Sequence, residues 1–205
     1  ASDWREYGWD DAFDSSGNWT HGPLHGYVYW AKNNGTNKSP KYEKAKQITA
    51  DGEPVDVYGC PSPNLVDWDD DGDLDLICGE FLDRITYFEN VGSRTSPEYA
   101  SGRFLKTDGQ TIHMELEMIQ VVACDFDRDG SVDLVVGQED GRVALIENTG
   151  QRNKGLPILR SPLFFEQQAA DVKCGALVIP CSFDGYGDGH EHLVCANTAF
   201  CLECI

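Results

Sequence analysis

Apolar side chains in this chain come in short runs with the spacing of β-strands. Residues 64–79, NLVDWDDDGDLDLICG, hold two apolar or alternating runs, rich in Leu, Ile and Val, on either side of an Asp-rich stretch that contains a glycine. Residues 85–92, ITYFENVG, form a β-branched and aromatic run that ends in an Asn-x-Gly turn signal. No segment has a convincing helical period of about 3.6 residues. The pattern predicts an all-β fold.

These elements recur in one order along the chain. Residues 122–137, VACDFDRDGSVDLVVG, repeat the pattern of residues 64–79, and their first aspartates, Asp67 and Asp125, are 58 residues apart. The aromatic run returns twice, and its aligned asparagines are Asn33, Asn90 and Asn148. A third element closes each unit, as Ser39–Tyr42, Ser96–Tyr99 and Ser161–Phe164, the last after an apparent insertion of about seven residues. Internal repetition at this period is typical of repeat architectures.

Each unit is predicted to be one propeller blade of four antiparallel strands. The fourth and weakest strand is FLKTDG, residues 104–109, with its counterpart KQITADG at 46–52. The whole chain, residues 1–205, then forms a single propeller segment of about three and a half blades. Its parts are the back half of a blade (1–51), two full blades (52–108 and 109–168) and the front half of another (169–205). An open solenoid of stacked β-hairpins is the structural alternative.

The chain resembles the FG-GAP/VCBS repeat family, which includes integrin α-subunit propellers and many bacterial secreted proteins. The resemblance covers about residues 20–200 and rests on the Asp loop, the Leu-Asp-Leu-Ile/Val-x-Gly strand and the Glu-Asn-x-Gly turn, all in register. It implies a larger propeller of about seven blades. Because closed propellers need at least four blades, we expect further blades in a longer protein, or else neighbouring chains that complete each other's half-blades.

The two Asp-rich loops predict two structural calcium sites. Oxygen side chains occupy alternate positions of each loop, and a glycine in the sixth position permits a sharp turn. The predicted metal residues are Asp67, Asp69, Asp71, Asp73 and Asp75 in the first loop, and Asp125, Asp127, Asp129, Ser131 and Asp133 in the second. Position 7 usually offers its backbone carbonyl, and position 9 is expected to close the ligand shell. Without a counter-ion the carboxylates would repel each other. A third copy, beginning at Ser182, has lost two of the acids.

Bulk composition favours cations over nucleic acids as partners. The formal net charge is −19, from 35 acidic and 16 basic residues, and phosphate binding needs clustered Lys and Arg. No apolar run approaches the length of a membrane span. Eight cysteines beside calcium loops suggest disulfides and an oxidising compartment, although Cys78, Cys124 and Cys195 lie in apolar runs where a thiol packs as a small hydrophobe. We therefore expect a secreted or cell-surface protein, with the periplasm as an alternative.

A second candidate region lies near the start of the chain. His21 and His25 precede the first aromatic strand and are weak candidates for acid and base catalysis. Trp19, Tyr27 and Trp30 lie beside them and are weak candidates for stacking on sugars. Loop histidines with surface aromatics are the simpler interpretation.

These observations favour an extracellular, calcium-stabilised propeller scaffold that binds glycans or partner proteins in adhesion or recognition. An enzyme is the less favoured class: a propeller polysaccharide lyase or glycosidase with its site near His21 and His25. The third possibility is a structural assembly protein whose blades are completed between chains. Fold alone does not decide among them.

Overall fold

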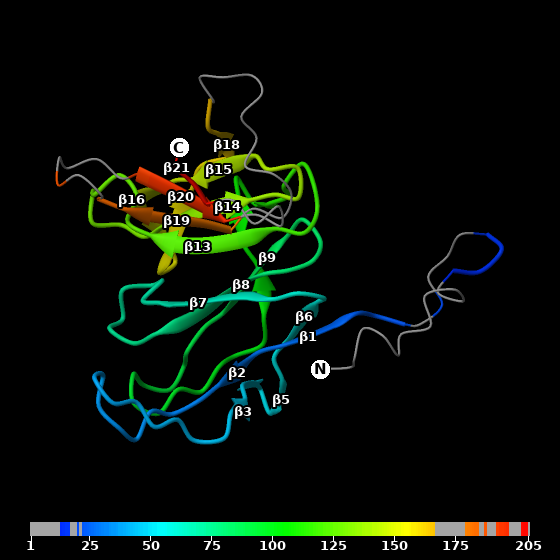
Figure 1. Ribbon diagram of the computed structural model, residues 1–205. Coiled ribbons are helices and arrows are strands. Elements are labelled where there is room, and N and C mark those ends of the chain that lie inside the picture. Colours follow the sequence, from blue (N-terminus) through cyan, green and yellow to red (C-terminus); the bar gives the residue numbers. More distant parts are fainter. Residues whose placement is uncertain are drawn as a thin grey trace.

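The computed structural model describes residues 13–16, 20, 22–166, 179–184, 187, 192–196 and 202–204. The described residues form strands, turns and loops, without a helix (Figure 1). They also contain no helix with the length and apolar character needed to cross a membrane. The predicted all-β class is confirmed.

Two four-stranded antiparallel sheets form the centre of the structure. The first has the order β10-β9-β8-β7, and the second the order β13-β14-β15-β18. Their strands are β7 (Ser62–Val66), β8 (Asp75–Gly79), β9 (Ile85–Phe88), β10 (Arg103–Phe104), β13 (Gln120–Cys124), β14 (Asp133–Gly137), β15 (Val143–Ile146) and β18 (Leu163–Phe164). Val66 pairs with Asp75 and Cys124 pairs with Asp133, so the two sheets repeat in register. The structure has the predicted propeller-like blades of four antiparallel strands.

Shorter pairs flank these sheets. On the N-terminal side, β1 (His25–Tyr27) pairs with β6 (Asp56–Tyr58), and β2 (Tyr29–Trp30) pairs with β3 (Lys46–Gln47). On the C-terminal side, β19 (Ile179–Phe183), β20 (His192–Ala196) and β21 (Leu202–Cys204) form a three-stranded sheet. Figure 1 shows these parts below and above the two central sheets.

The predicted fourth strand is shorter than expected. Only Arg103 and Phe104 join the first sheet, and the residues after them form a separate hairpin of β11 (Lys106–Thr107) and β12 (Gln110–Thr111). The reason is the Asp108-Gly109 turn, whose φ angles of 50° and 80° reverse the chain. Its counterpart turns between β4 (Thr49–Ala50) and β5 (Glu53–Pro54).

The apparent seven-residue insertion is also corrected by the strand register. Thr86 pairs with Phe104 in the first sheet, and Ala144 pairs with Phe164 in the second. The two units therefore differ by two residues, because 58 separates the first members of these pairs and 60 the second. Ser161–Phe164 is thus not equivalent to Ser96–Tyr99. The two extra residues lie in a longer hairpin of β16 (Asn148–Asn153) and β17 (Leu156–Leu159).

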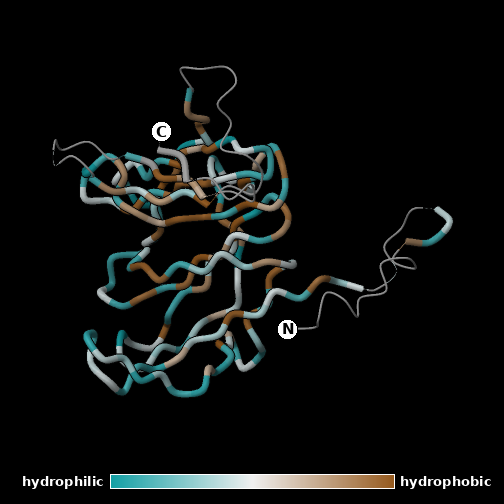
Figure 2. The backbone as a smooth tube through the Cα atoms, in the orientation of Figure 1, coloured by the Kyte–Doolittle hydropathy of each residue, from teal (hydrophilic) through white to brown (hydrophobic). Residues whose placement is uncertain are grey.

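The sheets are held together by side chains on both of their faces. Ile77 of β8 packs in a core cluster with Leu134 and Val136 of β14, whereas Leu76 and Cys78 pack in a second cluster with residues of the N-terminal part. All residues of β8 and β14 are buried. Figure 2 shows hydrophobic stretches running through the sheets and hydrophilic stretches along the loops. Alternating side chains therefore join each sheet to the one before and the one after it.

Polar side chains add to the joint between the two central sheets. The Asn64 amide donates to the Val121 carbonyl at 2.9 Å, and its oxygen accepts the Ala123 amide hydrogen at 3.1 Å. The Ser62 hydroxyl oxygen accepts the Val121 amide hydrogen at 3.0 Å. These bonds satisfy backbone groups of β13 that no strand on this side pairs with, so β7 and β13 lie side by side.

The predicted disulfides receive no support in the part of the chain that the structure describes, which contains none. Cys78 and Cys195 are fully buried, as expected of thiols that pack as small hydrophobes. Burial raises the pKa of the Cys78 thiol to about 12, so this thiol is unreactive. Cys174 and Cys201 lie outside the described residues.

Candidate metal centre

The two Asp-rich loops fold in the same way. In the first, the amide of Gly72 donates to Asp67 Oδ2 at 3.1 Å, and the amide of Asp71 donates to Asp69 Oδ1 at 3.3 Å. In the second, Gly130 donates to Asp125 Oδ2 at 3.1 Å, and Asp129 donates to Asp127 Oδ1 at 3.1 Å. A further amide, that of Asp73 or Ser131, donates to the carboxylate two residues before it. Each loop is thus a series of Asx turns that curls the chain around its own carboxylates.

Two positions in each loop have left-handed backbone conformations. The sixth residue is a glycine, as predicted, with φ of 96° at Gly72 and 93° at Gly130. The fourth residue is not a glycine, yet Asp70 has φ of 61° and Arg128 has φ of 63°. Such angles are uncommon for residues with a Cβ atom. The fourth position is therefore held in its conformation by the loop as a whole.

The loops bring carboxylate oxygens together. One oxygen from each of Asp67, Asp69 and Asp71 lies within 4.8 Å of the others in the first loop. In the second loop the converging residues are Asp125, Asp127 and Asp133. Of the other predicted metal residues, Asp73 is buried beside the first group, and Asp129 and Ser131 lie on the second loop.

Several of these oxygens lack a hydrogen-bond partner although they are buried. They are Asp67 Oδ1 and Asp73 Oδ1 in the first loop and Asp125 Oδ1 in the second. A buried carboxylate oxygen without a partner is costly. The equivalent position-1 oxygen is affected in both loops, so the same feature recurs in the repeat. Hard oxygen donors around such atoms fit a hard divalent cation.

The ninth residue of each loop has a different role from the one predicted. Asp75 accepts the amide hydrogen of Trp68 at 3.0 Å with one oxygen and that of Asn90 at 2.8 Å with the other. Asp133 accepts the corresponding amides of Phe126 and Asn148 at 3.0 and 2.8 Å. These buried carboxylates tie the end of the first strand to the end of the third. The ninth aspartate is a clamp for the blade, and in the second loop it also faces the converging oxygens.

Burial and mutual repulsion raise the pKa values of the loop carboxyls. Burial, then the charges of Asp75 and Asp71, raises the pKa of Asp69 to about 6. Burial also raises the pKa of Asp75 and of Asp133, against the hydrogen bonds that they accept from backbone amides. Two carboxylates 4.8 Å apart near a protein surface repel by about 3 kcal/mol. A bound cation would remove this cost.

The candidate residues near the start of the chain are only partly described. His21 and Trp19 lie outside the described residues. His25 Nδ1 lies 2.6 Å from Asp56 Oδ2, and its ring stacks on Tyr27 with centroids 5.4 Å apart. Trp30 is exposed, and the Lys46 ammonium lies over its ring. The structure therefore places His25 and Tyr27 together on β1, with Trp30 on the adjoining β2.

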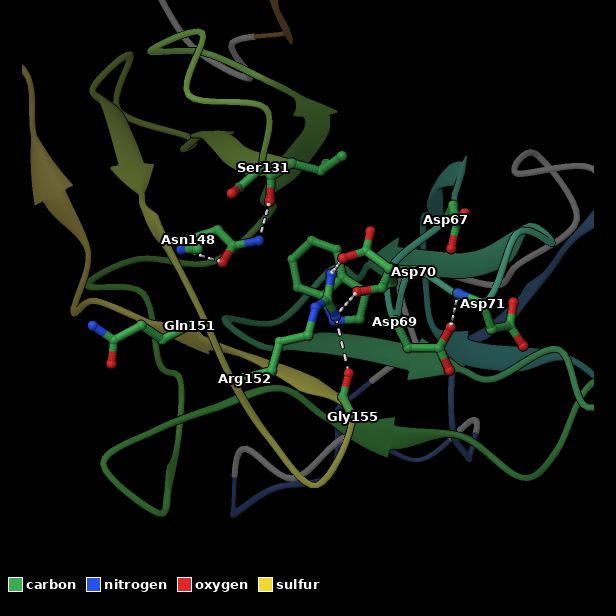
Figure 3. Close-up of polar contacts among 12 residues, drawn as sticks. Asp67, Asp69, Asp70, Asp71, Ser131, Asn148, Gln151, Arg152 and Gly155 are labelled. Atoms are coloured by element: carbon green, nitrogen blue, oxygen red, sulfur yellow. Dashed lines mark hydrogen bonds and ion pairs between the residues drawn. The ribbon is translucent and has the colours of Figure 1, made fainter.

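Sequence reasoning missed Arg152, which contacts the first loop from another sheet. It donates to the carbonyl of Trp68 at 3.0 Å and forms an ion pair with Asp70 (Figure 3). The residues lie more than 80 positions apart, and no motif marks the pair. The Asp clamp could have been found, because Asn90 and Asn148 recur at the same spacing as Asp75 and Asp133.

Residues 67–136 match the family model described as FG-GAP-like repeat. This segment is an FG-GAP-like repeat. The match begins at the first aspartate of the first loop and ends within β14 of the second unit, and it confirms the family predicted from the sequence. The repeat indicates a β-propeller-type recognition or scaffold protein. No curated protein matches the chain.

The clamp role of the ninth aspartate predicts a stability loss without any metal. In EDTA at pH 7, Asp75→Asn should lower the free energy of unfolding by about 1–3 kcal/mol, because the new amide faces a backbone donor. Urea denaturation measures this. Asp71→Asn is the matched control, since its remaining oxygen still accepts the Asp73 amide hydrogen. Equal losses in the two variants would contradict the clamp.

The raised pKa of Asp69 predicts a specific pH dependence in metal-free protein. The folded pKa lies above the unfolded value near 3.8, so this carboxyl's stabilising contribution is complete below that value and is lost as the pH rises through about 6. The melting temperature of the wild type should therefore fall relative to that of Asp69→Asn between about pH 4 and pH 6. Thermal unfolding in EDTA across this range tests it. A difference that does not change with pH would contradict the prediction.

Proposed function

We propose that this chain is an extracellular, calcium-stabilised propeller scaffold for binding glycans or partner proteins. The observation that carries the metal assignment is the convergence of three carboxylate oxygens in each loop, with a buried, unpartnered oxygen at Asp67 and at Asp125. Calcium takes six to eight hard oxygen ligands and accepts irregular geometry. The aspartates, the position-7 carbonyl and water supply such ligands.

The role of calcium in this proposal is structural. Each loop joins the first two strands of a sheet, β7 to β8 and β13 to β14. Cancelling the carboxylate repulsion stabilises that hairpin in its folded shape, where the Asp75 and Asp133 clamps reach the third strand. Residues of the loops at positions 1, 3 and 5 orient toward the ion, and the glycine at position 6 turns the chain.

Calcium titration should show two sites. Wild-type protein should bind two Ca²⁺, whereas Asp69→Asn and Asp127→Asn should each bind one. Each occupied site should stabilise the fold by about 2.7 kcal/mol when free Ca²⁺ is about 100-fold above its Kd. Isothermal titration and thermal unfolding measure both quantities.

Asp108→Asn is the control for the charge change, because Asp108 lies in the β11–β12 turn, away from both loops. It should keep two sites. Unchanged stoichiometry in the two loop variants, or a lack of stabilisation by Ca²⁺ in the wild type, would overturn the calcium assignment.

The ligand-binding part of the proposal rests on an exposed row of rings. His25, Tyr27 and Tyr29 alternate along the strand with the buried Gly26 and Val28, so the three rings share one face. Tyr27 is 39% and Tyr29 is 54% exposed, and His25 and Tyr27 are parallel to within 5°. A flat, polar-edged row of this kind suits the apolar face of a sugar ring better than a charged partner.

The row of rings predicts glycan binding that depends on Tyr29. Tyr29→Ala should weaken binding to a glycan found by array screening about tenfold, as expected from loss of one stacked ring. Phe183→Ala removes a similarly exposed ring from β19 and should leave binding unchanged. Surface plasmon resonance with the array hit measures both. Equal effects of the two variants would exclude this face as the glycan site.

A polysaccharide lyase or glycosidase is the second candidate, favoured by one observation. Asp56, the partner of His25, also lines a groove of about 470 Å³ together with Glu80 and Arg84. A positioned His–Asp pair beside acidic and basic groups is an arrangement suited to acid and base catalysis. Depolymerisation of an anionic polysaccharide by the wild type, lost in His25→Ala, would favour this candidate over a scaffold.

A further inference from the structure

The fourth residue of each Asp loop makes an ion pair with the following part of the chain. Asp70 pairs with Arg152 of the β16–β17 hairpin, which belongs to the next sheet's unit. Arg128 Nη2 lies 3.2 Å from Asp184 Oδ2, just after β19 of the sheet that follows. Both fourth residues have the left-handed backbone described above. The sign of the pair is reversed between the two loops, but its position is kept.

The first of these contacts is the more extensive. Arg152 Nη1 donates to the carbonyl of Trp68 at 3.0 Å and to that of Gly155 at 2.9 Å, while Nη2 contacts the Asp70 carboxylate. One guanidinium therefore joins the second and fourth residues of the first loop to the turn of a neighbouring hairpin (Figure 3). The planar fork of arginine suits such multiple acceptors, and lysine does not reproduce it.

The repeat itself shows why this contact exists at only one of the two loops. The residue 58 positions before Arg152 is Arg94, which donates to the Gly72 carbonyl at 3.3 Å in the loop of its own unit. The two extra residues of the β16–β17 hairpin lengthen it relative to its counterpart. The equivalent arginine then contacts the loop of the preceding unit instead of its own.

We infer that the β16–β17 hairpin holds the first Asp loop in its metal-binding shape through Arg152, so that occupancy of this loop and docking of the hairpin are coupled. Arg152 is a positioning residue in this role, because it fixes the backbone between Asp67, Asp69 and Asp71 without belonging to their group of converging oxygens. Coupling of two sites is reciprocal, so each should stabilise the other. The inference rests on the proposed calcium function, but the hairpin contact itself does not.

Hydrogen exchange without metal tests the contact first. In EDTA, Arg152→Gln should speed amide exchange of residues 148–159 and of residues 67–73. The matched control is Arg160→Gln, which makes the same charge change on the same hairpin, where Arg160 pairs with Glu147 at 2.9 Å and is largely exposed. Exchange in Arg152→Gln equal to that in Arg160→Gln would overturn the inference, whatever the protein does with calcium.

Calcium titration then tests the coupling. In an Asp127→Asn background, which leaves the first site, Arg152→Gln should weaken Ca²⁺ binding about fivefold or more, and Ca²⁺ should no longer slow exchange of the hairpin. In an Asp69→Asn background, which leaves the second site, the affinity should not change. Arg152→Lys should behave as Arg152→Gln does, because the fork is lost while the charge is kept.

Three outcomes separate the explanations. Tighter Ca²⁺ binding in Arg152→Gln with no change in Arg152→Lys would mean that Arg152 acts only by its charge, and would overturn the inference. Unchanged first-site affinity in both variants would also overturn it. Failure of the wild type to bind Ca²⁺ would refute the proposed function together with the coupling, while the exchange data would still decide whether the hairpin orders the loop.

Discussion

Leu76, Ile77 and Cys78 are consecutive residues of one strand, yet all three side chains are buried. In an antiparallel sheet with one solvated face, every second side chain would be exposed. Burial on both faces requires a sheet on each side, and the core clusters show it: Ile77 packs toward the second central sheet, and Leu76 and Cys78 toward the N-terminal strands. The remaining architecture depends on this constraint, since a blade of this kind cannot be stable alone.

Stacking of the sheets also decides where the charged loops lie. Each Asp loop follows the first strand of its sheet and is tied to the third strand by a buried aspartate, so the loop is positioned by the blade. The remaining carboxylates then converge because the loop has no room to spread them, and their pKa values rise. In this arrangement the same dense set of acids that would destabilise an empty loop makes it a good cation site. Stability and binding are linked through one short segment.

Joints between neighbouring units are as specific as the blades themselves. At the inner strands, Ser62 and Asn64 bridge β7 to β13 through backbone groups. Near the first loop, Arg152 connects the β16–β17 hairpin to the preceding unit. Neither feature is repeated at the equivalent positions, where the residues are Gln120, Val122 and Arg94 with its different contact. A repeat protein can thus carry individual contacts on a periodic frame, and these are places where function can differ between units.

The sequence was sufficient for the features that depend on local pattern. Apolar runs of strand length, the Asp loops with glycine in the sixth position and the repeat at 58 residues predicted the four-stranded antiparallel sheets, the family and the residues of the acidic clusters. These follow from local chemistry, because strand pairing between neighbours in sequence and turns around carboxylates need few distant contacts. The burial of Trp68 between sheets was predicted for the same reason, since the aromatic recurs at one place in each loop.

Tertiary structure alone decided the features that depend on pairing register and on distant contacts. Ser161–Phe164 looked like a displaced copy of Ser96–Tyr99, but hydrogen bonding between Ala144 and Phe164 shows a shift of only two residues. Asp75 looked like a metal ligand, but its oxygens are occupied by two backbone amides from separate strands. Arg152 carried no signal, because its partners are distant in sequence and are brought near only when the sheets stack. A sequence records which groups are present, whereas the choice among several possible partners is made by the packing of the whole chain.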